Sequence, residues 1–329
     1  MAQLEGSASV AKFMTADKLK DFQENGFVVI NEVLDPLKCD AIFSKCWDFV
    51  VKVSGGRVKR DDPTTHTTKH NWPGGVHGLV QHYGIGQTEA MWMVRTDENV
   101  LQMFAELYEA MGMAEEDASD LIATFDGMSF PRTNSQKYLS DDWLHKDQKL
   151  SSTEYNWNTQ SGINVGKSQD EDDHVFSCIP KSHDWHEEYA KANAALASEQ
   201  KGHFLKLTEE QIAWHAERGM ERIRVPIRKG SVVFWDSRLV HASSSSRKKA
   251  PEQRAQIFVS FVPRKMVPEK VLKRRREHFE KGRSTGHSGG LFSKRPRSYG
   301  KPDTGHVDAA PFYTEENPAP ELVRKLAGF

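Results

Sequence analysis

The stretch WLHKDQ, residues 143–148, is the key to the fold and to the site. It has the length and the apolar start of a short β-strand, in which successive side chains point to opposite faces. His145 and Asp147 would therefore point to one side of the strand, and Lys146 to the other. An imidazole and a carboxylate that converge from one face can bind a metal, form a hydrogen-bonded pair, or be neighbours by chance. The rest of the chain has to discriminate among these three interpretations.

Short predicted strands continue from this stretch to residue 263, and only one helical insertion, residues 185–219, interrupts them. Turn signals separate these strands, and no alternation of strand and helix is present, which favours a β-sandwich or jelly roll over a parallel α/β fold. The strands after WLHKDQ are SGINVGK (161–167), HVFSCIP (174–180), RIRVPI (222–227), SVVFWDS (231–237) and QIFVSFVP (256–263).

The segment before residue 143 predicts helices that flank this β-core. A helix runs from an N-cap at Thr15 to a stop at Gly26, a strand follows in FVVINEVL, and Asp35-Pro36 begins a second helix. Residues 55–90 are expected to form long loops, 97–111 a helix, and ATFDGMSF (123–130) a strand. The predicted fold is therefore mainly β with flanking helices, a β-sandwich or jelly roll.

The composition indicates a globular protein of a reducing compartment. Of 329 residues, 37% are hydrophobic and 28% charged, and no apolar run approaches the length of a membrane span. We see no secretory signal, and Cys39, Cys46 and Cys178 lack metal or disulfide spacing, so we expect a cytoplasmic protein without a membrane partner. We expect residues 1–14 to be flexible, 15–263 to form the catalytic domain, and 264–329 to be a basic extension.

The charge of this extension differs from that of the body. Residues 264–301 contain 13 Lys or Arg against three Glu, while the whole chain has a net charge of −1. A basic segment can bind nucleic acid or pack on an acidic body. Leu291, Phe292, Tyr299, Phe312 and Tyr313 are spaced along the extension like anchors, so we expect it to pack on the domain or on a second subunit of a homodimer, near the active-site mouth.

A third ligand makes a metal site credible. His241 follows the apolar strand SVVFWDS and lies 94 residues after Asp147, so a jelly roll can bring it opposite His145 and Asp147. Two imidazoles and one carboxylate form the facial triad of non-haem Fe(II) oxygenases. Catalytic zinc sites use the same ligand types, so a zinc hydrolase remains an alternative. A jelly-roll binding protein whose basic tail contacts nucleic acid is another.

The residues after His241 favour iron with 2-oxoglutarate. Arg254, 13 positions after His241, begins a strand, and a guanidinium held there suits a bidentate grip on the distal carboxylate of 2-oxoglutarate. Arg247 in the preceding loop is the rival anchor. Ser243 could add a hydroxyl to the same carboxylate, and Arg132 could reach the 1-carboxylate or be a solvated surface residue.

Five motifs in this order resemble the phytanoyl-CoA dioxygenase-like family of Fe(II)/2-oxoglutarate oxygenases, over roughly residues 17–263. They are FQENGFVVINEVLDP (22–36), WLHKDQ, FSCIPKSHDWH (176–186), GSVVFWDSRLVHAS (230–243) and Arg254. The chain departs from the family at Asp173-His174, where the family usually has Asn-Gly, and at PKSH, where Pro-Gly-Ser-His is commoner. These departures question the shape of a loop near the substrate and leave the metal ligands unaffected.

The resemblance implies a double-stranded β-helix core of the jelly-roll, cupin-like type. It implies a ferrous ion, 2-oxoglutarate and O2, with His145, Asp147 and His241 as the iron ligands. It also implies hydroxylation or desaturation of a C–H bond in a small-molecule substrate, with release of succinate and CO2. Halogenases of this class replace the carboxylate ligand with a small residue, so Asp147 favours hydroxylation or desaturation. His183 in PKSH is expected to stabilise a turn.

Overall fold

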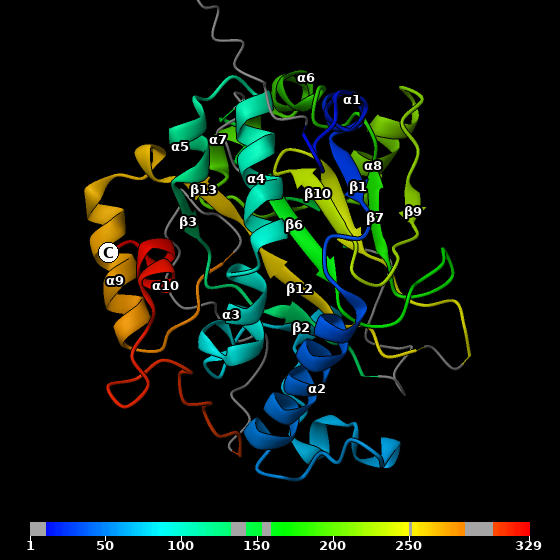
Figure 1. Cartoon of the computed structure of the whole chain (residues 1–329). Helices are drawn as coiled ribbons and strands as arrows, with labels where there is room; N and C mark the ends of the chain where they lie inside the picture. Colours follow the sequence, from blue (N-terminus) through cyan, green and yellow to red (C-terminus); the bar gives the residue numbers. More distant parts are fainter. Residues whose placement is uncertain (1–10, 133–142, 153–158, 250–251, 287–304) are drawn as a thin grey trace, which may run out of the picture.

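The centre of the computed structural model is a pair of antiparallel sheets packed face to face (Figure 1). The structure describes residues 11–132, 143–152, 159–249, 252–286 and 305–329. The larger sheet has the strand order β1-β10-β6-β12-β4-β2, and the smaller has the order β8-β5-β11-β7-β9. The pair β13-β3 lies apart from both sheets. The predicted fold class, a jelly roll with flanking helices, is confirmed.

The strands are short, as their sequences predict. The larger sheet contains β1 (Phe27–Ile30), β2 (Leu79–Val80), β4 (Met128–Ser129), β6 (Thr159–Asn164), β10 (Val232–Asp236) and β12 (Gln256–Val259). The smaller sheet contains β5 (His145–Lys146), β7 (Phe176–Ile179), β8 (Leu205–Lys206), β9 (Ile223–Val225) and β11 (Val240–Ser243). The separate pair is β3 (Leu121–Ala123) with β13 (Phe261–Pro263).

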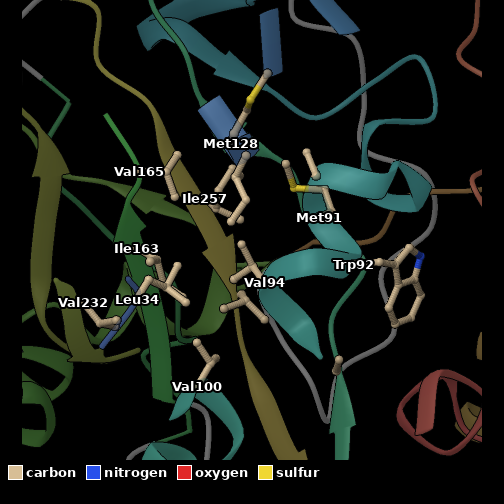
Figure 2. Packing of buried hydrophobic residues seen from close by; sticks show 14 of the residues in the cluster. Leu34, Met91, Trp92, Val94, Val100, Met128, Ile163, Val165, Val232 and Ile257 are labelled. Carbon is tan, nitrogen blue, oxygen red and sulfur yellow. The ribbon is translucent and has the colours of Figure 1, made fainter. Parts of the chain in front are cut away.

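The two faces of the larger sheet serve different purposes because side chains alternate along each strand. Ile163 of β6, Val232 of β10 and Ile257 of β12 point toward the helices and join the main hydrophobic core. Figure 2 shows these residues beside Met91, Val94 and Val100 of the covering helices. The alternate residues point to the smaller sheet, where Trp235 and Phe258 pack with Phe176 of β7. The site lies between the sheets, on this second face.

Helices cover the outer side of the larger sheet (Figure 1). Others form the insertion between residues 185 and 219 or belong to the C-terminal extension. The helices are α1 (Ala16–Asn25), α2 (Pro36–Val53), α3 (Glu89–Arg95), α4 (Glu98–Ala110), α5 (Glu115–Ser119), α6 (His186–Ala192), α7 (Ala194–Glu199), α8 (Glu209–Ala216), α9 (Glu269–Glu280) and α10 (Glu321–Ala327). None of those in the described part of the chain is long and apolar enough to cross a membrane.

The predicted start of the domain is largely correct. Thr15 caps α1 by accepting from the backbone N–H of Lys18, and Gly26 ends it with φ of +75°. Packing nevertheless begins before residue 15, because Phe13 and Met14 are buried and their backbone N–H groups donate to the Glu106 carboxylate. The expectation of a flexible segment up to residue 14 is therefore wrong for these two residues, while residues 1–10 lie outside the described part.

Several elements differ from the sequence prediction. The segment 123–130 includes parts of two strands in different sheets, because β3 ends at Ala123 and β4 begins at Met128. Gly127, just before β4, packs closely: a Cβ atom there would lie 1.9 Å from the carbonyl oxygen of Val80. QIFVSFVP likewise divides at Ser260 into β12 and β13. The short helices α3, α5 and α10 were not predicted from the sequence.

The described parts of the basic extension lie against the body. Arg275 of α9 is buried and donates to the carbonyl oxygen of Ala123, and Tyr313 packs edge-on against Trp92 at 5.9 Å. The backbone N–H of Val307 donates to the carbonyl oxygen of Val53 at 2.9 Å. Among the other proposed anchors, Phe312 donates its backbone N–H to the carbonyl oxygen of Gln87 at 2.8 Å, whereas Leu291, Phe292 and Tyr299 lie in residues 287–304, outside the described part.

Candidate active site

The pairing of β5 with β11 brings the two histidines of the site together. His145 and His241 are direct partners in this antiparallel register. Asp147 follows β5, and its backbone N–H donates to the carbonyl oxygen of Ser237 at 3.1 Å. Asp147 Oδ2 lies 3.8 Å from His145 Nε2 and 3.6 Å from His241 Nε2, and the three ligand atoms lie within 4.8 Å of one another.

Both imidazoles are held with Nε2 toward the carboxylate. His145 Nδ1 lies 3.0 Å from the carbonyl oxygen of Trp143, and His241 Nδ1 lies 3.0 Å from that of Leu239. A carbonyl oxygen only accepts, so in each ring Nδ1 is the donor, and in the neutral imidazole the lone pair that can bind a metal lies on Nε2. Ligand atoms that share one ion at ~2 Å each are separated by roughly 3–4 Å, so the three residues fit a single metal ion.

Gln160 of β6 orients the carboxylate from across the pocket. Its Nε2 donates to Asp147 Oδ2 at 2.9 Å. This hydrogen bond connects the metal group, on the smaller sheet, to the larger sheet. It resembles the outer hydrogen bonds that fix ligating carboxylates in metal sites.

Trp143 supports His145 through stacking. The two rings lie 4.7 Å apart at an angle of 21°, and His77 stacks on the other face of Trp143 at 4.0 Å. Trp143 Nε1 donates to the carbonyl oxygen of Ser243 at 2.8 Å, which ties β5 to β11. His77 belongs to the loop region 55–90, so this loop reaches the site.

Lys146 points away from the site, as the alternation of the strand predicts. Its Nζ donates to the carbonyl oxygens of Ser182 at 3.2 Å and Arg238 at 2.8 Å, and it lies over the ring of Tyr189. Burial lowers the pKa of Lys146 to about 7. The opposite face of β5 is therefore closed and polar.

The ligand atoms open into a pocket whose walls are largely apolar. It contains about 570 Å³ of space, including its mouth. The lining residues are Leu79, Gln81, Trp143, His145, Asp147, Phe176, Phe204, Trp235, His241, Ala242, Ser243, Gln256 and Phe258. Phe204, from the insertion, is 52% exposed although its ring lies 5.0 Å from that of His145, so it stands at the mouth.

Arg254 is a buried cation beside this pocket. Its guanidinium donates to Gln256 Oε1, while within the described part of the chain its Nε has no hydrogen-bond partner and the side chain makes no ion pair. Burial, with a smaller contribution from Arg224, lowers the pKa of Arg254 to about 9. A buried cation without an acidic partner is costly unless a carboxylate ligand completes it.

The other candidates for co-substrate binding occupy different surroundings. Ser243 lines the pocket, two residues after His241. Arg247 lies at the surface and pairs with Asp172 at 3.3 Å, so its charge is used outside the pocket. Arg132 is half-buried at the edge of the described residues and is not among those of them that line the pocket. Its assignment to the 1-carboxylate stays a prediction, as does that of Ser243 to the distal one.

Sequence reasoning missed three contributors to the site: Gln160, Gln256 and Phe204. A glutamine in a strand follows no characteristic spacing, so only the register of β6 and β12 shows that both amides face the pocket. Phe204 follows the helices of the insertion and reaches the site because β8 pairs with β5. His183 was expected to stabilise a turn, and its Nε2 lies 3.0 Å from the carbonyl oxygen of Gln23.

A family model and a curated fungal protein are similar to parts of this chain. Residues 171–251 match the family described as phytanoyl-CoA dioxygenase (PhyH), a span that includes His241. Ava biosynthesis cluster protein O from Aspergillus versicolor is 23% identical over 266 residues, which cover 79% of this chain and 82% of that protein.

Solved structures with the same fold include a putative oxidoreductase from Salmonella typhimurium LT2. It has a TM-score of 0.59 and 11% identity, and the match covers 85% of this chain and 80% of that one. The epimerase SnoN, in complex with Fe3+, alpha ketoglutarate and nogalamycin RO, has a TM-score of 0.47 and 14% identity, with coverage of 74% and 82%.

Proposed function

We propose that this chain, a member of the phytanoyl-CoA dioxygenase-like family of non-haem Fe(II)/2-oxoglutarate-dependent oxygenases, hydroxylates or desaturates a C–H bond of a small, largely apolar substrate. The observation that carries this proposal is the convergence of His145, Asp147 and His241 at the base of an aromatic pocket. When bound, iron and 2-oxoglutarate supply the oxidation: O2 is consumed, 2-oxoglutarate gives succinate and CO2, and hydroxylation transfers the second oxygen atom to the substrate.

His145, Asp147 and His241 would hold the iron from one side. Their backbone and Gln160 contacts fix the two imidazoles and the carboxylate before metal binds, so little reorganisation is needed. Three protein ligands leave the remaining coordination positions for the co-substrate and O2. The same donors could bind zinc, but a zinc hydrolase has no use for the buried Arg254 beside them.

Arg254 would hold the distal carboxylate of 2-oxoglutarate. The guanidinium is buried and has no acidic partner in the described chain, and a dicarboxylate supplies one. Ser243 is placed on the pocket wall to add a hydroxyl donor to that carboxylate. We assign the 1-carboxylate contact to Arg132 only as a proposal.

The pocket favours a substrate with an apolar body. Leu79, Trp143, Phe176 and Phe204 contribute to its walls, and the described residues that line it include no lysine or arginine. A phosphate-bearing substrate would leave its charges without a partner in such a pocket. We therefore favour a neutral small molecule, and the similarity to a protein of a biosynthesis cluster supports this choice.

Nucleic acid is the weaker candidate partner because the basic extension uses much of its charge internally. Arg264 pairs with Asp120, Lys265 with Asp117 at 2.6 Å, and Arg276 with Glu269. The first two pairs join the extension to the body, and the third lies within α9. Binding that weakens steeply with salt on generic DNA or RNA would favour the alternative.

The direct test is a coupled assay on iron-loaded protein. Protein reconstituted with Fe(II) under anaerobic conditions is mixed with 2-oxoglutarate, O2 and members of a library of neutral small molecules, and succinate is measured. We expect succinate above background with at least one substrate, and an oxidised product of that substrate, with no signal from Asp147→Ala. Hydrolysis of a library member by zinc-loaded protein, without succinate, would support the hydrolase instead.

A further inference from the structure

Gln256 stands between the pocket and the buried arginine. It is the first residue of β12 and lines the pocket, whereas Arg254, two residues earlier, does not. The Arg254 guanidinium donates to Gln256 Oε1. A ligand in the pocket therefore reaches the amide of Gln256, to which the guanidinium is hydrogen-bonded.

The other end of this amide lacks a partner. Gln256 is 2% exposed, and its Nε2 has no hydrogen-bond partner within the described part of the chain. Arg254 Nε is also buried without a hydrogen-bond partner in the described residues. A buried N–H without an acceptor is destabilising, and native proteins satisfy nearly all such groups. Two unsatisfied donor groups on hydrogen-bonded neighbours indicate a missing acceptor, and a carboxylate offers two oxygens that accept.

A glycine in the neighbouring strand makes room for this amide. A Cβ atom at Gly162 of β6 would lie 2.3 Å from Gln256 Nε2, far inside contact distance. Gly162 pairs with Phe258, and Gln160 on the same face of β6 holds Asp147. One face of β6 therefore supports the metal ligand through Gln160 and leaves space for Gln256 through Gly162.

We propose that Gln256 is a positioning residue for the co-substrate: its Oε1 orients the guanidinium of Arg254, and its Nε2 donates to the distal carboxylate of 2-oxoglutarate. Gly162 provides the space in which the amide takes this orientation. The inference rests on the proposed function, because it assumes that 2-oxoglutarate binds in this pocket. It adds a neutral donor beside the cation and a steric requirement on β6.

The test separates the distal carboxylate from the rest of the co-substrate. Binding of 2-oxoglutarate and of 2-oxovalerate, which has the same length but ends in a methyl group, is measured by calorimetry on Mn(II)-loaded protein. Loss of a hydrogen bond to a charged group should weaken 2-oxoglutarate binding by about tenfold or more in Gln256→Ala. Binding of 2-oxovalerate should stay within about twofold, because it has no carboxylate at that end.

Two further variants test the geometry. Gly162→Ala should weaken 2-oxoglutarate binding because the new methyl group displaces the amide of Gln256. A variant that carries both Gly162→Ala and Gln256→Ala should bind 2-oxoglutarate about as weakly as Gln256→Ala alone. The effects of two substitutions on one shared contact are not additive. Gln256→Glu should cause the largest loss, because its carboxylate takes the guanidinium and repels the ligand.

The control is Gln169→Ala, which removes another buried glutamine, one that does not line the pocket, and should leave both affinities unchanged. Gln256→Met preserves volume and serves the same test if Gln256→Ala fails to fold. Equal losses for both 2-oxo acids, or unchanged 2-oxoglutarate binding in Gln256→Met or Gln256→Ala, would overturn the inference. Wild-type protein that binds neither 2-oxo acid would instead contradict the proposed function itself.

Discussion

The two faces of β5 both bury titratable side chains, but they differ in what those side chains can do. On one face His145 and Asp147 direct ligand atoms toward that of His241, beside an open pocket. On the other face Lys146 donates hydrogen bonds to two backbone carbonyl oxygens and packs against Tyr189. His186 and His215 are also buried near Lys146, and burial lowers their pKa values to about 3 and about 4.

Shifted pKa values and burial therefore do not by themselves identify an active site. The Lys146 face carries a lowered pKa, yet it does not border the pocket. The His145 face is identified by the convergence of three ligand atoms at an open cavity. We therefore expect substitutions on the His145 face to abolish catalysis and substitutions on the Lys146 face to change stability.

The largest expected effect is that of Asp147→Ala. Removing one of three ligands should weaken Fe(II) binding by more than the ~10–100-fold typical of losing an outer hydrogen bond, and turnover should fall to background. Iron content and circular dichroism of the purified variant check this. A variant that keeps full activity would show that Asp147 is not a ligand.

Arg254→Ala should have the next largest effect, on the co-substrate alone. A buried charge pair that loses one partner costs ~2–5 kcal/mol, which corresponds to a rise of roughly 30- to several thousand-fold in the KM for 2-oxoglutarate. Arg247→Ala is the matched control, because that side chain pairs with Asp172 at the surface. The reverse ranking of the two variants would move the anchor to Arg247.

Lys146→Met should change stability and spare the chemistry. It leaves the carbonyl oxygens of Ser182 and Arg238 without their buried donor, which should lower the free energy of unfolding by about 1–3 kcal/mol. Denaturant unfolding measures the loss, and calorimetry should find unchanged affinity for Fe(II). A variant of wild-type stability that no longer binds iron would break the distinction between the two faces.

The smallest expected effect is on the pH dependence of the unfolding free energy. His186 and His215 have lowered pKa values in the folded protein, so the unfolded state takes up protons first as pH falls below the ordinary value of about 6.5. Their stabilising contribution is full above that pH and is lost between about 6.5 and 4. The His215→Phe variant should lose less stability over this window than wild type, measured as unfolding free energy against pH. An identical slope would contradict the assignment.

The sequence predicted the strands of the jelly roll well because their apolar alternation is local. It failed where the chain passes from one sheet to another: β3 ends at Ala123 and β12 ends at Val259, although the segments 123–130 and 256–263 look continuous. The positions of His145, Asp147 and His241 could be predicted because ligand types are few and each adjoins an apolar strand. Gln160 and Gln256 could not, since their roles depend on cross-strand register alone.

The most direct test of the central claim is the Fe(II) stoichiometry of His241→Ala beside that of His215→Ala, measured by anaerobic titration of metal-free protein. Both histidines are buried, and only His241 faces Asp147. We expect one Fe(II) per chain for wild type and for His215→Ala, and loss of tight Fe(II) binding for His241→Ala. Unchanged stoichiometry and affinity in His241→Ala would contradict the assignment of iron to this site.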